Sequence, residues 1–350
     1  MKRDSQDSFV SVIILNYNAG DLLTDCVESL FNIIHKNFEV IVVDNASRDD
    51  SHKKCKDRFP KIRLIENKEN LGYCEGNNVG IRAARGDFIM ILNPDTIVHS
   101  ECITELMSGY SKYGDGLYQP KILDNESHEI FISTGNFMNI LGFGYSRAKG
   151  KKDLGQYDND QEIGYASGTC LFTTAKILKQ LGNFDPFLFA YHDDLDLGWR
   201  GKIQGIKSYY IFNAIIYHPF EGYSFKLNQF KMYLLERNRI YCIFKNFSVA
   251  SIVKCLPLLL LIDIMVTLFY LKSGFFWIKI KANLNILRNI RHIHQSKKEI
   301  QKNRKLTDKE IIRIFTDDVE IPLWMKIYSK KMIYHKIIKI TSEMMRKIIN

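Results

Sequence analysis

The chain lacks the cysteine patterns that mark disulfide-rich or zinc-binding proteins. Its seven cysteines are odd in number and scattered, and none forms a Cys-x-x-Cys pair or a cluster with histidine. We therefore expect free thiols, as in a reducing compartment. The amino terminus also lacks an apolar signal segment, because polar residues lead straight into the first apolar run at Phe9. Both absences predict a protein of the cytosol.

The excess of positive over negative charge is confined to the last part of the chain. The net charge is +10, but residues 272–350 alone hold 19 Lys and Arg against 7 Asp and Glu. The rest of the chain is therefore slightly negative. A basic surface of this kind fits nucleic acid or an anionic membrane.

Apolar, β-branched runs alternate with helical patterns at the start of the chain. Strands are expected at residues 9–15, 38–43, 62–65 and 87–92. Helices are expected between them, at residues 20–34, up to about 58, and 77–84. Strands that are apolar on both faces and alternate with helices are typical of a parallel sheet covered on both sides. We therefore predict an α/β fold, in which ligands bind at the carboxyl ends of the strands.

Polar residues follow three of these strands. They are Asn16, Tyr17 and Asn18 after the first, Asp44 and Asn45 after the second, and Asn93-Pro94-Asp95-Thr96 after the fourth. One such cluster would be an ordinary turn, but three at one edge of one sheet indicate a binding site. The first turn lacks a Gly-x-Gly-x-x-Gly sequence, which excludes a dehydrogenase. It also lacks the Gly-rich, basic loop that a sugar nucleotidyltransferase would show.

The chain changes character after residue 228. A helix at 229–244 precedes an apolar stretch between Lys254 and Lys272, whose only charge is Asp263. As a helix this stretch spans about 25 Å, slightly less than the roughly 30 Å of bilayer hydrocarbon. Residues 274–294 have the pattern of one basic amphipathic helix. We favour an interfacial pair of helices over a membrane span or a soluble helical subdomain.

Five segments, taken together, resemble family-two glycosyltransferases with the GT-A fold. They are VSVIILNYNAGDLL, FEVIVVDNASRDDS, NLGYCEGNNVGI, GDFIMILNPDTIV and FAYHDDLDLGWR. The resemblance is greatest to the bacterial rhamnosyltransferase-like branch and covers about residues 9–245. It implies a mostly parallel nucleotide-diphospho-sugar transferase sheet in a catalytic domain at 1–245, followed by a basic, membrane-associating helical region at 246–350.

The resemblance also implies an inverting enzyme that moves a sugar from a nucleotide-diphosphate donor. dTDP-rhamnose is the favoured donor, and the acceptor is a glycan or lipid-linked molecule in cell-surface polysaccharide synthesis.

Residues 133–162 are Gly-rich and show no helical or strand periodicity, so we expect them to form a mobile loop over the site.

Residues at the strand ends are expected to hold the donor. Asp44 would accept a hydrogen bond from a pyrimidine N3–H, with Asn16 and Asn45 beside it and Tyr17 against the base or ribose. The backbone at Gly72 would approach a phosphate closely. Asn78 would begin a helix whose dipole favours the diphosphate.

A divalent ion, Mg²⁺ or Mn²⁺, is expected beside the diphosphate. Asn93-Pro94-Asp95 stands where the family has Asp-x-Asp, so Asp95 is the expected ligand and Asn93 a weaker neighbour. His218, at the end of a strand expected at 208–216, is the expected second ligand. The ion would offset charge that builds on the departing diphosphate. Asn93 in place of a carboxylate, and the acidic Glu75 where a small residue is usual, depart from the family pattern.

The acidic pair Asp193 and Asp194 is expected to supply the catalytic base. Asp194 would deprotonate the acceptor hydroxyl, and Asp193 takes the position usually held by Glu. The alternative is a charge cluster at a helix N-terminus. Trp199 could stack on a sugar or belong to the core.

Two further absences narrow the expected activity. The chain has no Gln-x-x-Arg-Trp motif and no series of long apolar spans, which argues against a processive synthase. The apolar spacing of the basic tail fits a bilayer better than a nucleic-acid groove. We therefore expect a peripheral protein at the inner face of the cell membrane that binds no nucleic acid. The alternative function is a non-catalytic, membrane-bound nucleotide-sugar-binding protein.

Overall fold

The computed structural model describes residues 8–222, 228–317 and 331–350, with side chains from residue 335 onward in the last segment. These residues form two compact units. Of the described residues, the sheet unit comprises 8–136, 146–198 and 206–222, and the helical unit comprises 137–145, 199–205, 228–317 and 331–350. The helical unit thus includes two short segments and most of α7 (Gln229–Asn246), all of which lie within the first 245 residues. The expected ends of the catalytic domain, residues 1 and 245, stay a prediction.

The sheet unit is built on a mostly parallel sheet, as the sequence predicts. Its described strands follow the order β10-β12-β6-β11-β4-β1-β2-β3, with β5 paired to β12 and β7 to β6. The strands are β1 (Val10–Asn16), β2 (Phe38–Asp44), β3 (Arg63–Glu66), β4 (Phe88–Leu92), β5 (Ile97–Val98), β6 (Gly116–Asp124), β7 (Phe131–Ser133), β10 (Gln161–Ile163), β11 (Cys170–Thr174) and β12 (Lys207–His218). β1 to β4 run parallel, as do β6 and β12, and β11 runs antiparallel between β4 and β6.

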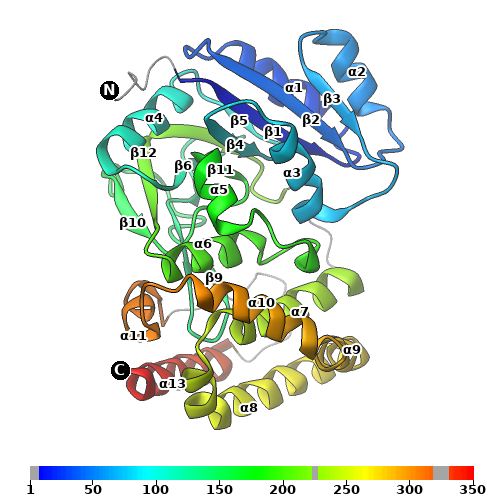
Figure 1. Ribbon diagram of the computed structural model, residues 1–350. Coiled ribbons are helices and arrows are strands. Elements are labelled where there is room, and N and C mark those ends of the chain that lie inside the picture. The colour runs from blue at the N-terminus through cyan, green and yellow to red at the C-terminus, as the bar shows by residue number, and fades with distance from the viewer. Residues whose placement is uncertain (1–7, 223–227, 318–330) are drawn as a thin grey trace. The chain divides into compact units, whose positions relative to one another are not determined.

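Helices cover both faces of this sheet because its central strands are apolar on both sides (Figure 1). The helices are α1 (Asp21–Phe31), α2 (Ser51–Arg58), α3 (Gly72–Ala83), α4 (Cys102–Tyr113), α5 (Ala175–Leu181) and α6 (Asp193–Ile203). Val10, Val12 and Ile14 of β1 share one core with α1 and α4. α3 packs on the opposite face, where Gly76 and Gly80 contact Leu15 and Ile13. This layering brings the polar strand ends together at one edge of the sheet.

Two expectations about local structure within the first 162 residues are wrong. The segment 133–162 is not a structureless loop, because it contains β8 (Asn136–Met138), β9 (Gly144–Ser146) and β10. β8 and β9 pair with each other. The helix expected to begin near Asn78 begins at Gly72, so Asn78 lies within α3.

The helical unit contains an apolar core under a series of helices. Its described helices are α7 (Gln229–Asn246), α8 (Val249–Lys272), α9 (Phe276–Arg288), α10 (Ile290–Lys302), α11 (Asp308–Ile311) and α13 (Lys331–Ile349). Trp199 is fully buried here, with its ring 4.8 Å from Phe247 and 5.2 Å from Phe315. Trp199 is therefore a core residue. The single amphipathic helix expected at 274–294 is instead two helices, α9 and α10, which meet at Asn289.

Candidate active site

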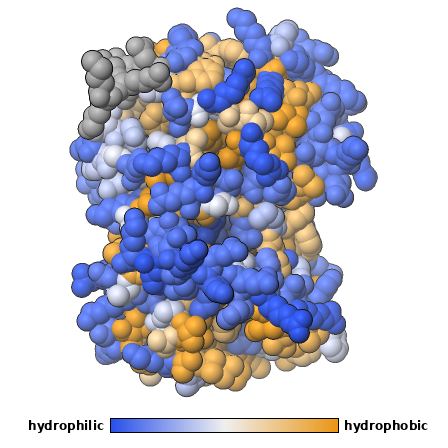
Figure 2. All heavy atoms as spheres, viewed as in Figure 1, coloured by the Kyte–Doolittle hydropathy of each residue, from blue (hydrophilic) through white to orange (hydrophobic). Residues whose placement is uncertain are grey.

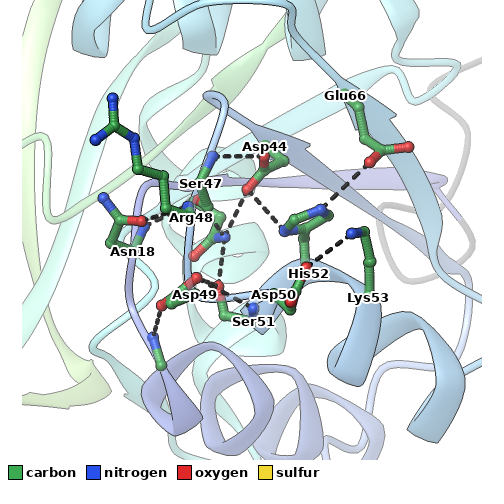
Figure 3. A network of polar contacts seen from close by, with 12 residues as sticks. Asn18, Asp44, Ser47, Arg48, Asp49, Asp50, Ser51, His52, Lys53 and Glu66 are labelled. Carbon is green, nitrogen blue, oxygen red and sulfur yellow. Dashed lines mark hydrogen bonds and ion pairs between the residues drawn. The ribbon is translucent and has the colours of Figure 1, made fainter.

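Asp44 is the centre of a buried polar network at the end of β2 (Figure 3). Its side chain is 3% exposed and accepts hydrogen bonds from Asn16 Nδ2 at 2.8 Å and from the Ser47 amide at 2.9 Å. Asn16 Nδ2 also lies 2.8 Å from Ser51 Oγ. Asn16 and Asp44 are register partners of the parallel strands β1 and β2, which explains why the two side chains meet. The structure therefore joins these two predicted residues in one network.

His52, on α2, completes this network and was missed by the sequence reasoning. Its Nδ1 lies 3.3 Å from Asp44 Oδ1, and its Nε2 lies 3.3 Å from Glu66 Oε1. The His52 ring is buried, whereas the Glu66 side chain is 59% exposed. The only sequence signal is its position in the first turn of the helix after β2, since nothing in the spacing pairs it with Asp44 or Glu66.

Tyr17 is exposed whereas Asn45 is buried. Tyr17 directly follows β1 and is 43% exposed, so its ring could pack against a base. Asn45 is buried, and its amide joins the loop before α3 by donating to Gly72 O at 3.0 Å and accepting from Asn67 at 2.9 Å. Asn45 thus positions a loop, and its predicted contact with the donor stays a prediction.

The structure gives Gly72 and Asn78 contacts that the sequence did not predict. A Cβ on Gly72, whose φ is +77°, would lie 2.6 Å from the carbonyl oxygen of Phe189, so the backbone that approaches this glycine closely is that of Phe189. Asn78 donates to Phe184 O at 2.9 Å and accepts from Phe184 N at 3.1 Å. Asn78 therefore links α3 to the segment before α6, and it does not begin a helix. Glu75, the unexpected acid, pairs with Arg82 at 2.6 Å.

Asp95 and His218 form a buried pair, although 123 positions separate them in the sequence. His218 Nε2 lies 3.3 Å from Asp95 Oδ1. His218 Nδ1 lies 2.7 Å from the carbonyl oxygen of Pro219. Because a carbonyl only accepts, Nδ1 carries the proton and Nε2 is the nitrogen that faces Asp95. Gly222 packs on this pair, since a Cβ there would lie 3.2 Å from Asp95 Oδ2 and 3.3 Å from His218 Cε1.

This pair fits a divalent ion. Two adjacent ligands of an octahedral ion, each about 2.1 Å from it, lie about 3 Å apart, close to the separation of Asp95 and His218. A metal-bound histidine commonly donates its other ring N–H to a backbone carbonyl, as His218 does. No group of three His, Cys, Asp or Glu side chains suited to a metal occurs among the described residues. Further ligands would therefore come from the donor diphosphate and water, and Asn93 adds no carboxylate.

Asp194 is held at the start of α6 by two backbone amides. Its Oδ2 accepts from Gly168 N at 3.0 Å and its Oδ1 from Leu195 N at 2.7 Å. The carbonyl of Gly168 accepts from the Tyr73 hydroxyl at 2.6 Å, and Asp193 Oδ2 lies against the same glycine. Gly168 and Tyr73, two residues that the sequence reasoning missed, thus fix the acidic pair.

Burial changes the acidity of this cluster. It raises the pKa of Asp193 well above its usual range, and the neighbouring Asp194 carboxylate raises it further. Burial also raises the pKa of Asp194, but the amides of Gly168 and Leu195 stabilise its ionised form. Burial, with both carboxylates nearby, raises the pKa of the Tyr73 hydroxyl well above its usual range. Asp194 is the better candidate for the ionised base, with a pKa shifted toward neutrality.

A chain of backbone contacts links the acidic pair to the Asp95 turn. Asn93 N donates to Thr169 O at 3.0 Å, and Thr169 follows the glycine that holds Asp194. On the other side, the segment before α6 is strained, because Phe189, Tyr191 and His192 have φ between 62° and 66°. Non-glycine residues adopt such conformations where surrounding structure enforces them, often at functional sites.

The fold has a close likeness among solved structures. The structure of GalNAc-T7 with UDP, GalNAc and Mn²⁺ aligns with a TM-score of 0.58 and 14% sequence identity, over 69% of this chain and 48% of that chain. This chain thus spans about half the length of GalNAc-T7. The sheet and this alignment define the GT-A fold.

Residues 11–182 match the sequence model described as Glycosyl transferase family 2. These residues form a family-two glycosyltransferase domain, as the sequence motifs predict, and the chain is an enzyme that transfers a sugar from a nucleotide donor.

Curated relatives agree with this assignment. The low-salt glycan biosynthesis hexosyltransferase Agl10 of Haloferax volcanii is 26% identical over 66% of this chain and 74% of its own length. The N-acetylglucosaminyl-diphospho-decaprenol L-rhamnosyltransferase of Mycobacterium tuberculosis is 25% identical over 59% of this chain and 75% of its own. Rhamnosyltransferase WbbL of Escherichia coli is 24% identical over 66% and 94%.

Proposed function

We propose that the protein is an inverting glycosyltransferase in which Asp194 is the catalytic base. The observation that carries this proposal is the arrangement of Asp194, whose carboxylate is fixed by Gly168 N and Leu195 N and lies beside the more strongly perturbed Asp193. Asp194 would take the proton of the acceptor hydroxyl as that oxygen attacks the anomeric carbon. Inversion follows from this single displacement. An anomeric NMR analysis of the product tests it, since retained configuration would exclude one direct displacement.

Asp95 and His218 would hold the divalent ion, either Mg²⁺ or Mn²⁺. When bound, the ion supplies positive charge that stabilises the departing nucleoside diphosphate. His218 is kept in the required tautomer by Pro219 O, and the absent side chain at Gly222 leaves room beside the pair. Asn93 would contribute through its backbone and position the turn.

Asp44 would recognise the donor base. Its carboxylate is buried and ordered by Asn16 and Ser47, and an N3–H of uracil or thymine is a suitable donor to it. Tyr17 would cover the base or ribose, and Asn45 and Gly72 would hold the neighbouring loop. Names of the relatives above favour rhamnose as the sugar, so a dTDP- or UDP-linked donor is the first to test.

The acceptor would be a glycan, or a lipid-linked glycan, of cell-surface polysaccharide synthesis. One relative's name specifies an acceptor carried on decaprenol diphosphate. A lipid-linked acceptor requires the enzyme to reach a membrane. We therefore propose a peripheral protein on the inner face of the cell membrane, held through the basic helical unit.

Membrane attachment rests on the surface of the helical unit. Among the described residues α8 is the one helix long and apolar enough to cross a membrane, and only 17% of its most apolar 18-residue window is buried. Of the exposed large apolar side chains, three lie in the sheet unit and the others in the described part of the helical unit. Flotation with anionic vesicles tests the attachment, and binding to DNA instead at the same salt would contradict it.

A non-catalytic nucleotide-sugar-binding protein is the second candidate, favoured only by the replacement of one carboxylate by Asn93. Release of nucleoside diphosphate from sugar donors by the purified protein separates the two. Turnover that depends on Asp194 supports the enzyme, and tight donor binding without any turnover supports the binding protein.

A further inference from the structure

The single acidic residue of α8 is tied to the core of the helical unit. Lys279 of α9 is completely buried and contacts Asp263 of α8 and, at 2.6 Å, Glu236 of α7. Arg239 makes two hydrogen bonds to the same Glu236 carboxylate, at 2.7 and 3.0 Å. Asn283 adds a bond to Asp263 at 3.2 Å. This charge cluster, made of these five residues, joins three helices.

α8 is held to the unit along the rest of its inner side as well. The Tyr270 hydroxyl donates to Met232 O at 3.0 Å, and Tyr270 and Phe269 pack on Met232. Cys255 and Ile262 are buried on the same side. A helix that crossed a bilayer would have to leave these contacts, and Lys279 would lose Asp263 as a partner in a buried setting.

The opposite side of α8 is an apolar stripe. Apart from the adjacent pair Leu260 and Leu261, its exposed members recur every three or four residues along the helix; they are Val249, Val253, Leu256, Leu260, Leu261, Ile264, Leu268 and Leu271. α9 adds Trp277, which is 77% exposed. Apolar side chains gather along this edge in Figure 2, where α8 lies in the same view of Figure 1. Exposed Lys254 and Lys272 stand near the two ends of the helix.

We propose that α8 lies flat in the surface of an anionic membrane, with its apolar stripe in the lipid, and does not cross the bilayer. The inner side of the helix is fixed by the charge cluster, so only the stripe is available to lipid. Basic side chains near both ends would contact headgroups of one leaflet. This inference rests on the membrane attachment proposed above.

The test places a cysteine at each end of α8 in the full-length protein bound to sealed anionic vesicles. Lys254→Cys and Lys272→Cys are treated with a membrane-impermeant maleimide before and after detergent, with Lys61→Cys in the sheet unit as the control. All seven native cysteines are buried, so their background labelling is low. We expect both α8 variants to be labelled without detergent to the same extent as the control.

Two results would overturn the inference in different ways. If one end of α8 is protected until detergent is added, the helix crosses the bilayer, although the membrane attachment stands. If the unmodified protein does not float with vesicles, the attachment fails and the flat orientation fails with it.

A second inference comes from the donor end of the sheet unit. Both ring nitrogens of His52 face carboxylates, Asp44 on one side and Glu66 on the other. Asp44 is buried, and among the described residues His52 is the only side chain within ion-pair distance of it that can carry positive charge. Lys53, the next residue, pairs instead with Asp50 at 2.7 Å. A buried carboxylate needs such a partner to keep its charge and orientation.

We infer that His52 is a positioning residue for base recognition, with Glu66 anchoring its ring. It would keep the Asp44 carboxylate aimed at the N3–H of the base. This rests on the base-binding role of Asp44. His52→Leu should therefore weaken UDP and dTDP binding by about tenfold and bring their affinity close to that of CDP, which has no N3–H.

The matched variants separate the outcomes. His52→Gln, which keeps one donor, should restore part of the preference for UDP over CDP, whereas a change in folding alone would lower all three affinities equally. If His52→Leu keeps the full preference while Asp44→Asn loses it, the inference about His52 is wrong and the role of Asp44 stands. If Asp44→Asn also keeps the preference, the base-binding role itself fails.

Discussion

Buried charges are treated differently in the two units. In the helical unit, Glu236 lies between Arg239 and Lys279, and these two cations offset the effect of burial and lower its pKa below the usual range. In the sheet unit, Asp193 lies beside Asp194, and burial raises the pKa values of both. A buried acid that is paired with cationic side chains is part of the structural scaffold. Acids without them keep a capacity to take a proton.

The Asp95 pair extends this contrast. Asp95 Oδ1 lies 3.3 Å from a ring nitrogen of His218, a separation that fits two ligands of one divalent cation. Structural and functional charged residues can therefore be told apart by the groups that surround them. We also expect substitutions in the two units to change different measured properties.

The largest expected effect is on transfer by Asp194→Asn. The amide keeps the shape of the side chain but cannot take a proton, so kcat should fall by about 10³-fold, within the range for general-base catalysis. Donor affinity should stay within a few-fold. Steady-state kinetics with a soluble acceptor measures both, and Asp115→Asn, at an exposed ion pair, is the control. Near-normal kcat would move the base to another residue.

Breaking the charge cluster of the helical unit should act on stability instead. Lys279→Met leaves Glu236 and Asp263 without a common partner and should lower the free energy of unfolding by about 3–5 kcal/mol. The control is Lys176→Met, which breaks an exposed pair worth at most about 1 kcal/mol. Urea unfolding gives the comparison. Equal effects for the two lysines would mean that the cluster is not the scaffold described here.

Asp95→Ala should remove the dependence of donor binding on the ion. Nucleoside diphosphate should bind about 10²-fold more weakly in Mg²⁺ or Mn²⁺, as expected when a metal ligand or its support is lost, whereas affinity for the free nucleoside should not change. Calorimetry with and without chelator measures this. Undiminished turnover in excess chelator would contradict an essential ion.

Charge on the apolar stripe should weaken membrane binding by at least about tenfold, because Leu260→Asp removes apolar burial and adds repulsion from anionic lipid. Vesicle flotation is the measurement. Leu154→Asp, at a leucine 78% exposed in the sheet unit, should have no effect. Removal of the whole region after Asn246 is a poorer test, because Phe247 and Phe315 cover the buried ring of Trp199.

The smallest expected effect is on how the stability of the protein depends on pH. A carboxyl whose folded pKa is raised binds more protons in the folded than in the unfolded protein, so its contribution to stability falls as pH rises through the window above the unfolded value. Asp193→Asn should therefore raise the melting temperature at neutral pH and not near pH 3. Glu236, with a lowered folded pKa, contributes stability above its unfolded pKa and loses it in acid. Glu236→Gln should lower the melting temperature at neutral pH.

The sequence predicted the sheet and the strand-end residues because buried runs and polar turns are local signals. Asn16 and Asp44 follow two such runs, and their meeting follows from strand register. Local patterns could not place Phe189 against Gly72 or Phe184 against Asn78, since these contacts join distant segments. For the same reason they missed Gly168 and His52.

The account is tested most directly by one comparison of turnover. Release of nucleoside diphosphate from UDP-, dTDP- and GDP-linked sugars is measured with the full-length protein and with Asp194→Asn, each in Mn²⁺ and in chelator. We predict release from a uridine or thymidine donor that requires both the ion and Asp194. Release at the same rate by the Asp194→Asn variant in chelator would contradict the assignment of this site.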